Sequence, residues 1–516
     1  MPGREQLRGR SLMLTVSLVT CLGFMLVGYD NGLMGGLVDS PAFNSTFNHP
    51  KPKMIGLIVA IFEIGCFLGS IGAAIFGERL GRRWTIGHGC WIMMAGAVLQ
   101  AAAYSRAQLI FGRVVSGIGV GIVNSTVPVL QAEFSPKASR GLSTLNFGIF
   151  VVYWINYAFS PRTDSWAWRV PVILQCCIII PIVFALMLIP ETARWLAAHD
   201  RPDDCLAVLA RMHDAPTSDD GVRRIHGKIL RTVALESSAC SGSWRSLLRR
   251  DRFHSRRRLL IACAIQSFQQ LGGINAVICE TFSSSSLHHT CIYNFLLLRL
   301  TLPASDYTNT LFQKSIGFGP RTAALMSGYL QTWFFVASFI PWLLIDRIGR
   351  KPLFLSMISL MACAMATHAG LICQIENKTD AARVSGIAAA VMLFVFQGAF
   401  TIGFQATVWV YPSEILPLGL RQKGSSLSTA ANWIFNYMIV QMTPIAIDNI
   451  GWKTYIIFAV FNAIWVPVIF FCFPETKGLE LEEVDRLFAG KDFEEYPMPK
   501  QRLAETLKDL RHLEAV

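Results

Sequence analysis

Long apolar stretches separated by short polar segments recur along almost the whole chain. Because each residue of an α-helix rises about 1.5 Å, an apolar helix of about 20 residues can cross the roughly 30 Å of hydrocarbon in a bilayer. Twelve stretches are near or above this length, and they lie at roughly 12–36, 54–76, 84–104, 109–130, 142–159, 168–189, 259–278, 322–345, 352–373, 387–410, 427–446 and 452–473. The pattern predicts an all-α membrane protein with twelve transmembrane helices.

Positive charge is concentrated in alternate loops between these spans. The basic residues are Arg79, Arg82 and Arg83; Lys137 and Arg140; Arg347, Arg350 and Lys351; Arg421 and Lys423; and the run RSLLRRDRFHSRRR at 245–258. Basic loops stay on the cytoplasmic side, so we expect a multi-pass protein with both termini in the cytoplasm. The net charge of +12 then reflects topology. We expect the lipid bilayer as a partner and no nucleic acid.

The composition agrees with this class of protein. Hydrophobic residues make up 53% of the chain and charged residues 16%, whereas about a quarter of the residues of soluble proteins are charged. The basic start resembles a signal peptide, but the apolar run continues through Asp30 without a cleavage pattern, so we expect it to be retained. The 13 cysteines form no CxxC pair, and the loops hold no catalytic constellation. We therefore expect no metal, no other cofactor and no enzyme.

The second half of the chain repeats motifs of the first half in the same order. GERLGRR corresponds to DRIGRK, AEFSPKASRG to SEILPLGLRQKG, and PETARWL to PETKGLE. Parallel repeats of this kind build alternating-access transporters, in which the substrate binds between the halves. The predicted organisation is a cytoplasmic N-terminus (1–10), a six-helix bundle (11–189), a cytoplasmic central loop (190–258), a second six-helix bundle (259–473) and a cytoplasmic tail (474–516).

The charged residues of the repeated motifs form a candidate cytoplasmic gate. Arginines can pair with carboxylates across helix ends in one conformation and release them in another. The candidate residues are Glu78, Arg79, Arg82, Arg83, Glu133, Arg140, Glu191, Asp346, Arg347, Arg350, Glu414, Arg421 and Glu475. The alternative is that each arginine only sets the orientation of the chain, but the repeated arrangement of Arg and Glu favours a gate.

The combination of motifs resembles the sugar porter family of the major facilitator superfamily, and its fungal members in particular. The matching segments are RVVSGIGVGIVNSTVPVLQAE, PETARWL, QQLGGIN, DRIGRK, YPSEILPLGLRQKGSS, ANWIFNY and PETKG. The resemblance covers about residues 10–490 and implies twelve helices in two six-helix bundles, the major facilitator fold, around a central sugar site.

The resemblance assigns this site to Gln269, Gln270, Asn275, Trp409 and Asn432. The chemistry fits, because amides donate and accept hydrogen bonds to sugar hydroxyls and an aromatic ring packs against the sugar ring. The alternative for each amide is a hydrogen bond between helices, and it is the better explanation of Gln266 or Asn436 taken alone. Trp409 could instead be an interfacial aromatic residue.

Asp30, Glu63 and Arg113 lie well inside the predicted spans, where a charge is costly and usually functional. Asp30 and Arg113 match the proton-site acid and its arginine partner in the family's proton symporters. The alternative is a static buried ion pair. Glu63 is also in mid-span, and the sequence gives it no role.

Two segments depart from the family pattern. The span at 142–159 is short and lacks the glutamines expected there, so Asn146 or Asn156 would have to substitute for them. Residues 279–306 form an atypical insertion, Ser-rich at its start, after GGINAVI. Our hypothesis is that this insertion is translated intron, which a spliced transcript lacking its codons would verify; the alternative is an extracellular loop.

These observations predict a plasma-membrane transporter that takes a sugar, a hexose or a related molecule, together with protons. The alternatives are a uniport facilitator of sugars or polyols and a nutrient sensor that does not transport. Sensors usually carry a long cytoplasmic tail, and the tail from 474 to 516 is short.

Overall fold

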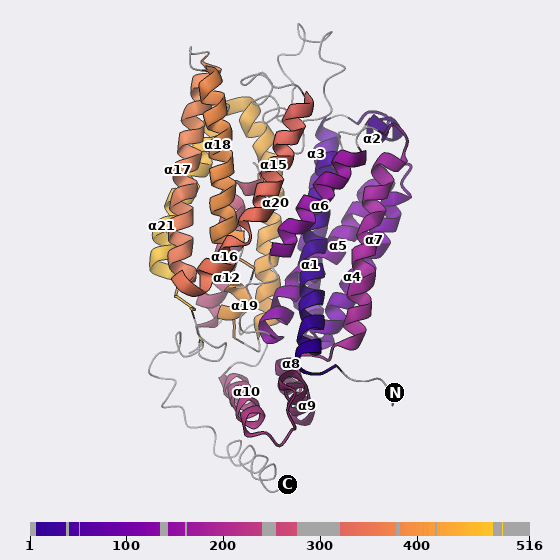
Figure 1. Cartoon of the computed structure of the whole chain (residues 1–516), viewed down its shortest axis with the longest axis vertical. Coiled ribbons are helices and arrows are strands. Elements are labelled where there is room, and N and C mark those ends of the chain that lie inside the picture. Colours follow the sequence, from indigo (N-terminus) through magenta and orange to yellow (C-terminus); the bar gives the residue numbers. More distant parts are fainter. Residues whose placement is uncertain are drawn as a thin grey trace.

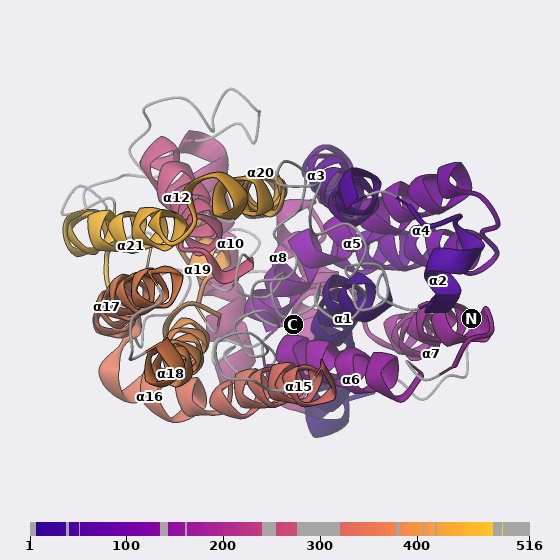
Figure 2. The ribbon, with the colours of Figure 1, turned by 90° about the horizontal axis from the view of Figure 1, so that it is seen from above.

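The computed structural model describes residues 7–37, 41–50, 52–134, 143–159, 162–239, 254–275, 320–377, 382–405, 407–409, 411–417, 420–477, 484 and 488. Arg140 and the insertion at 279–306 lie outside these residues. Within them the chain forms helices arranged as two side-by-side groups, which Figures 1 and 2 show from the side and from above. We call these groups the N half and the C half.

The N half contains the first six predicted spans, each as one helix. These helices are α1 (Gly9–Leu37), α3 (Pro52–Leu80), α4 (Arg82–Ala101), α5 (Arg106–Phe134), α6 (Ser143–Phe159) and α7 (Trp166–Leu188). A short helix, α2 (Pro41–Thr46), covers one end of this half. We call that end of the molecule the α2 end.

The C half covers the other six predicted spans. Its elements are α12 (Ser255–Leu271), α15 (Pro320–Ala337), α16 (Ile340–Ile348), α17 (Arg350–Glu376), α18 (Ala382–Phe400), the π-helix η4 (Thr401–Gln405), α19 (Tyr411–Ile415), α20 (Arg421–Ile450) and α21 (Lys453–Cys472). The eighth span was predicted as one helix at 322–345, but it is broken at Ser338 and Phe339 between α15 and α16. The tenth span ends in a π-helix, a feature often found at functional sites.

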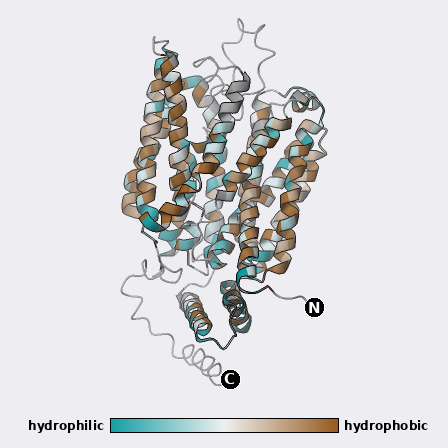
Figure 3. Cartoon of the chain, viewed as in Figure 1, coloured by the Kyte–Doolittle hydropathy of each residue, from teal (hydrophilic) through white to brown (hydrophobic). Residues whose placement is uncertain are grey.

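The helices carry apolar residues over their length, as a bilayer requires (Figure 3). Seven helices of the described chain are long and apolar enough to cross a membrane, and α6 is a shorter apolar helix of 17 residues. The helix α20 is long enough with 30 residues but carries many polar side chains, so apolar character alone does not mark every span.

The central loop forms a small helical cluster at the lower end of the molecule in Figure 1. Its helices are α8 (Ala193–Ala198), α9 (Pro202–His213) and α10 (Asp220–Ala239), and Leu196, Leu209 and Ile229 contribute to its own apolar core. Of these helices, α8 and α9 lie below the N half. Arg211 of α9 donates to the backbone oxygen of Leu7, so α1 begins at the same end of the molecule. We call this end the basic end, because α4, α17 and α20 also begin there with Arg82, Arg350 and Arg421 (Figure 1).

Glycines allow α3 and α5 to pack with their backbones nearly in contact. A Cβ atom added at Gly69 would lie 2.1 Å from the backbone oxygen of Ile118, and one added at Gly121 would lie 2.1 Å from that of Cys66. Small residues at such positions let membrane helices approach closely. Across the two halves, α3 packs against α20 and α6 packs against α15.

Gly69→Ala is expected to destabilise the protein by about 1–3 kcal/mol, because the added methyl group must push α3 away from α5. Gly72→Ala in the same helix is the matched control, since a Cβ atom there meets nothing within 4 Å. Thermal unfolding of the two variants in detergent measures the difference. Equal unfolding temperatures would show that α3 and α5 do not pack this closely.

Candidate functional site

Amide side chains of α12 and α20 form one buried hydrogen-bonded network. Asn432 of α20 donates to Gln269 Oε1 at 2.9 Å and accepts from Gln270 Nε2 at 3.1 Å. Asn275 Nδ2 donates to Gln270 Oε1. Gln269, Gln270 and Asn432 are each no more than 5% exposed. The structure therefore brings together four of the five residues predicted to bind sugar.

Two further amides belong to the same network. Gln266 Oε1 accepts from Asn432 Nδ2 at 2.8 Å, while Gln266 Nε2 donates to the backbone oxygen of Val408 at 3.1 Å. Asn436 Oδ1 accepts from Asn275 Nδ2. The sequence favoured a role between helices for these two residues when each was considered alone. The structure shows that the same side chains join helices and complete the polar site.

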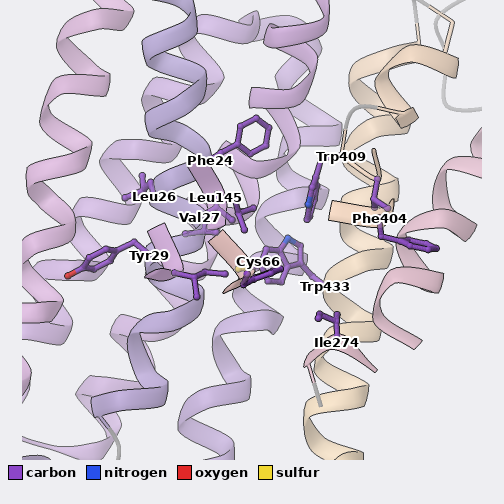
Figure 4. Packing of buried hydrophobic residues seen from close by; sticks show 14 of the residues in the cluster. Phe24, Leu26, Val27, Tyr29, Cys66, Leu145, Ile274, Phe404, Trp409 and Trp433 are labelled. Atoms are coloured by element: carbon purple, nitrogen blue, oxygen red, sulfur yellow. The ribbon is translucent and has the colours of Figure 1, made fainter. Parts of the chain in front are cut away.

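Trp409 lies between the C-terminal end of η4 and α19, and its indole is 6% exposed. Its Nε1 atom is buried and has no hydrogen-bond partner, and the same is true of Trp433 Nε1. Figure 4 shows both indoles among the buried side chains between the halves, with Phe24 of α1 nearby and Phe404 toward the C half. Two buried indole donors without partners are suited to a polar ligand.

The asparagines of α6 are already engaged in contacts between helices. Asn146 Nδ2 donates to the backbone oxygen of Phe334 in α15 at 3.3 Å, and Asn156 Nδ2 donates to that of Leu33 in α1 at 3.0 Å. Their Oδ1 atoms are buried without partners. Each asparagine thus keeps one acceptor for a ligand while its amide nitrogen fixes α6.

Asp30 and Arg113 form a buried ion pair between α1 and α5. Arg113 Nη1 lies 3.4 Å from Asp30 Oδ1, and the hydroxyl of Ser116 donates to Asp30 Oδ2 at 2.9 Å. Asp30 is fully buried and Arg113 is 2% exposed. The neighbouring Tyr29 points away from this pair, because its hydroxyl donates to the backbone oxygen of Pro171 in α7.

Arg113 also contacts α3. Its Nε and Nη2 atoms donate to the backbone oxygens of Ile58 and Val59, and its guanidinium lies 4.4 Å from the centre of the Phe62 ring. Phe62 packs edge-on against Trp433 at 6.2 Å, and Trp433 follows the network residue Asn432. The ion pair of the N half and the amide network of the C half are therefore linked through the rings of Phe62 and Trp433, where α3 packs against α20.

At the basic end, each half repeats the same arginine–glutamate contact. Arg82 Nη2 lies 3.0 Å from Glu133 Oε1 in the N half, and Arg350 Nη2 lies 3.3 Å from Glu414 Oε1 in the C half. A threonine completes each arrangement, because Thr192 donates to Glu133 and Thr476 donates to Glu414. The sequence repeat is thus a structural repeat.

The glutamates of the two PET motifs bind helix starts. Glu191 accepts from the backbone N–H groups of Arg82 and Arg83, and Glu475 accepts from those of Arg350 and Lys351. A carboxylate at a helix N-terminus satisfies donors that have no partner within the helix. Burial raises the pKa of the Glu191 carboxyl, although these N–H groups and Arg82 oppose the shift.

The two halves are connected at this end by side chains of α20 and α5. Arg421 Nη1 lies 3.9 Å from Glu133 Oε1, and Gln422 Nε2 donates to Thr126 Oγ1 at 3.1 Å. All four side chains are at least 95% buried. Glu133 thus interacts with an arginine of its own half and with one of the opposite half.

The other candidate gate residues lie around this connection. Glu78 Oε2 is 3.4 Å from Arg82 Nη1, Arg83 donates to the backbone oxygen of Met187, and Arg79 and Arg347 are exposed. Asp346 is in the last turn of α16, and its side chain lies outside the described part of the structure. Arg140 is outside it altogether.

In Arg421→Met we expect the two halves to be open at the basic end for a larger fraction of the time, because the substitution removes the charge that faces Glu133. A loss of about 1 kcal/mol changes such an equilibrium about fivefold. The opening is measured as the rate at which a maleimide labels a cysteine introduced by Ser426→Cys, after subtraction of the rate for the chain without this cysteine. Ser426 is a suitable position because it hydrogen-bonds Gln422 at this contact. Arg421→Lys keeps the charge and is the control. An unchanged labelling rate in Arg421→Met would contradict the gate.

Two parallel six-helix halves around a buried polar site define a transporter of the major facilitator type. The sequence profile of the sugar (and other) transporter family matches residues 16–294 and 290–488, and the chain belongs to this family. Members of the family are transporters, so the prediction that the protein is not an enzyme is confirmed. The two matched segments meet inside the atypical insertion.

Individual relatives support the same family. The chain is 33% identical over 522 residues to the sugar transporter STL1 of Saccharomyces cerevisiae, covering 96% of this chain and 84% of the relative. It is 33% identical over 494 residues to the MFS-type transporter oryC of Aspergillus oryzae, covering 93% and 86%. The proton:xylose symporter XylE, solved with 6-bromo-6-deoxy-D-glucose, has the same fold, with a TM-score of 0.75, 21% identity and coverage of 93% and 99%. The predicted major facilitator fold is confirmed.

Proposed function

We propose that the protein is a plasma-membrane symporter that carries a hexose or a related sugar together with a proton. It works by alternating access, with the basic end and both termini in the cytoplasm. The observation that carries the proposal is a buried amide network and a buried ion pair linked through Phe62 and Trp433 at the contact of α3 with α20. The amide network is suited to binding a sugar, and the ion pair is suited to binding a proton.

The amide network supports the sugar. Gln269, Gln270, Asn275 and Asn432 present donors and acceptors inside an apolar bundle, and Trp409 adds an aromatic face. Neutral groups that both donate and accept match sugar hydroxyls and leave the site uncharged. Sugar transporters among the relatives, and a sugar in the solved XylE structure, support the same substrate class.

The ion pair supports coupling to protons. A carboxylate that is paired with Arg113 in one conformation and separated from it in another binds its proton with different affinity in the two. The solved neighbour XylE is a proton:xylose symporter, which supports this mode of transport. The Glu133 and Arg421 contact holds the halves together at the basic end, as expected of a state closed toward the cytoplasm.

Uptake of labelled D-glucose, D-xylose, maltose and sorbitol by yeast without its own sugar transporters tests the proposal. We expect uptake of at least one hexose or pentose, faster at pH 5 than at pH 7.5, and its loss when an uncoupler dissipates the proton gradient. Sugar uptake that the uncoupler leaves unchanged would show a uniport facilitator. No uptake of any sugar would favour a sensor.

A further inference from the structure

Glu63 is a buried carboxyl group that the ion pair does not use. It lies in the middle of α3 and is 7% exposed, and its Oε2 atom is buried with no hydrogen-bond partner. A buried carboxylate without a partner is unfavourable in an apolar bundle, so the group requires an explanation.

Its surroundings identify what it can interact with. The residue before it, Phe62, lies under the guanidinium of Arg113, and Arg113 also interacts electrostatically with Glu63 itself. The thiol of Cys66, three residues later on the same face of α3, interacts with Asp30, Glu63 and Arg113 (Figure 4 shows Cys66 among the buried side chains). Among the described residues, these four groups are the titratable members of the cluster.

A count of charges favours one bound proton in the cluster. If Asp30 and Glu63 were both ionised and Arg113 charged, the cluster would carry one net negative charge in the interior of the bundle. One proton on either carboxyl removes that charge. Asp30 is bound by Arg113 and by the hydroxyl of Ser116, whereas Glu63 Oε2 has no hydrogen-bond partner, so this arrangement favours the proton on Glu63.

We propose that Glu63 and Asp30 compete for Arg113, and that Glu63 holds the transported proton while Asp30 is paired with Arg113. While Arg113 pairs with Glu63, Asp30 takes up one proton from water on one side of the membrane. When Arg113 turns to Asp30, this proton passes to the carboxyl group of Glu63, whose O–H bond breaks when the proton is released to water on the other side. The carrier then returns without the proton, with both ionised carboxylates sharing Arg113. This inference rests on the proposed proton symport and adds a second carboxyl to it.

The experiment uses the full-length protein in liposomes that contain a pH-sensitive dye. The sugar is D-glucose, or whichever sugar of the uptake panel is taken up faster. Proton entry is measured after this sugar is added outside the liposomes. It is compared with the exchange of labelled sugar, measured with equal sugar concentrations on both sides. Glu63→Gln cannot exchange a proton, so we expect its ratio of proton entry to sugar exchange to fall at least tenfold. Glu63→Asp keeps a titratable group and is expected to keep at least a third of the ratio.

His368→Gln is the matched control, because it removes a buried titratable side chain from α17 of the other half. We expect the ratio to stay within twofold of the original chain. If proton entry remains coupled to sugar transport in Glu63→Gln as it is in the original chain, the role of Glu63 is overturned but the proposed symport is not. Loss of sugar exchange in both Glu63 variants would show a structural side chain and also overturn it. An original chain without proton entry would overturn both this inference and the proposed symport.

Discussion

Asp30→Asn is expected to abolish proton-driven accumulation of sugar. A proton that moves with the sugar across a potential of 100 mV contributes about 2.3 kcal/mol, which corresponds to about fiftyfold accumulation. Asparagine keeps the shape of the side chain but cannot alternate between charged and neutral forms beside Arg113. Internal sugar should therefore rise only to the external concentration, which labelled uptake at pH 5 measures.

Ser116→Ala is the matched control for this variant. It removes the hydrogen bond to Asp30 Oδ2 but leaves the carboxylate and Arg113 in place. We expect it to accumulate sugar above the external concentration, with a changed pH dependence. Gradient-driven accumulation by Asp30→Asn would show that the ion pair is a static contact between α1 and α5.

Asn432→Ala is expected to raise the KM for sugar by about tenfold or more. Asn432 connects Gln269, Gln270 and Gln266, so its removal takes a ligand contact away and leaves buried amides without a partner. Each buried polar group left unpaired costs about 1–3 kcal/mol, or roughly five- to 150-fold in affinity. Initial rates of labelled uptake over a range of sugar concentrations measure the change.

Asn462→Ala is the control for this second variant. Asn462 is an equally buried amide of the C half, but its side chain donates to the backbone oxygens of Gly272 and Phe458. We expect a smaller rise in its KM than in that of Asn432→Ala. A KM within twofold of the original for Asn432→Ala would mean that the amide network holds helices together and does not bind the sugar.

The apolar pattern predicts the helices well because the bilayer fixes their length and composition. Every predicted span is occupied by a helix of the structure. The pattern does not predict the break at Ser338 and Phe339 or the π-helix at Thr401–Gln405, because both ends of a broken span stay apolar and only the backbone hydrogen bonds change. Local backbone geometry of this kind depends on packing against neighbouring helices.

The candidate site is predictable in part. The family resemblance pointed to Gln269, Gln270 and Asn432, which the structure places in one network, but membership of Gln266 in that network depends on a contact between residues 166 positions apart. The sequence also suggested arginine partners for Glu191, whereas the structure shows that backbone N–H groups at the start of α4 bind most of this carboxylate. A charge pattern specifies which groups can pair, and the fold selects among them.

Simultaneous measurement of sugar and proton entry into liposomes tests the central claim most directly. With purified protein and an inward proton gradient, we expect labelled sugar to accumulate above its external concentration and each sugar to enter with about one proton. Asp30→Asn should equilibrate the sugar without proton entry. Sugar that enters the liposomes of the original chain without protons, and never exceeds its external concentration, would contradict the account.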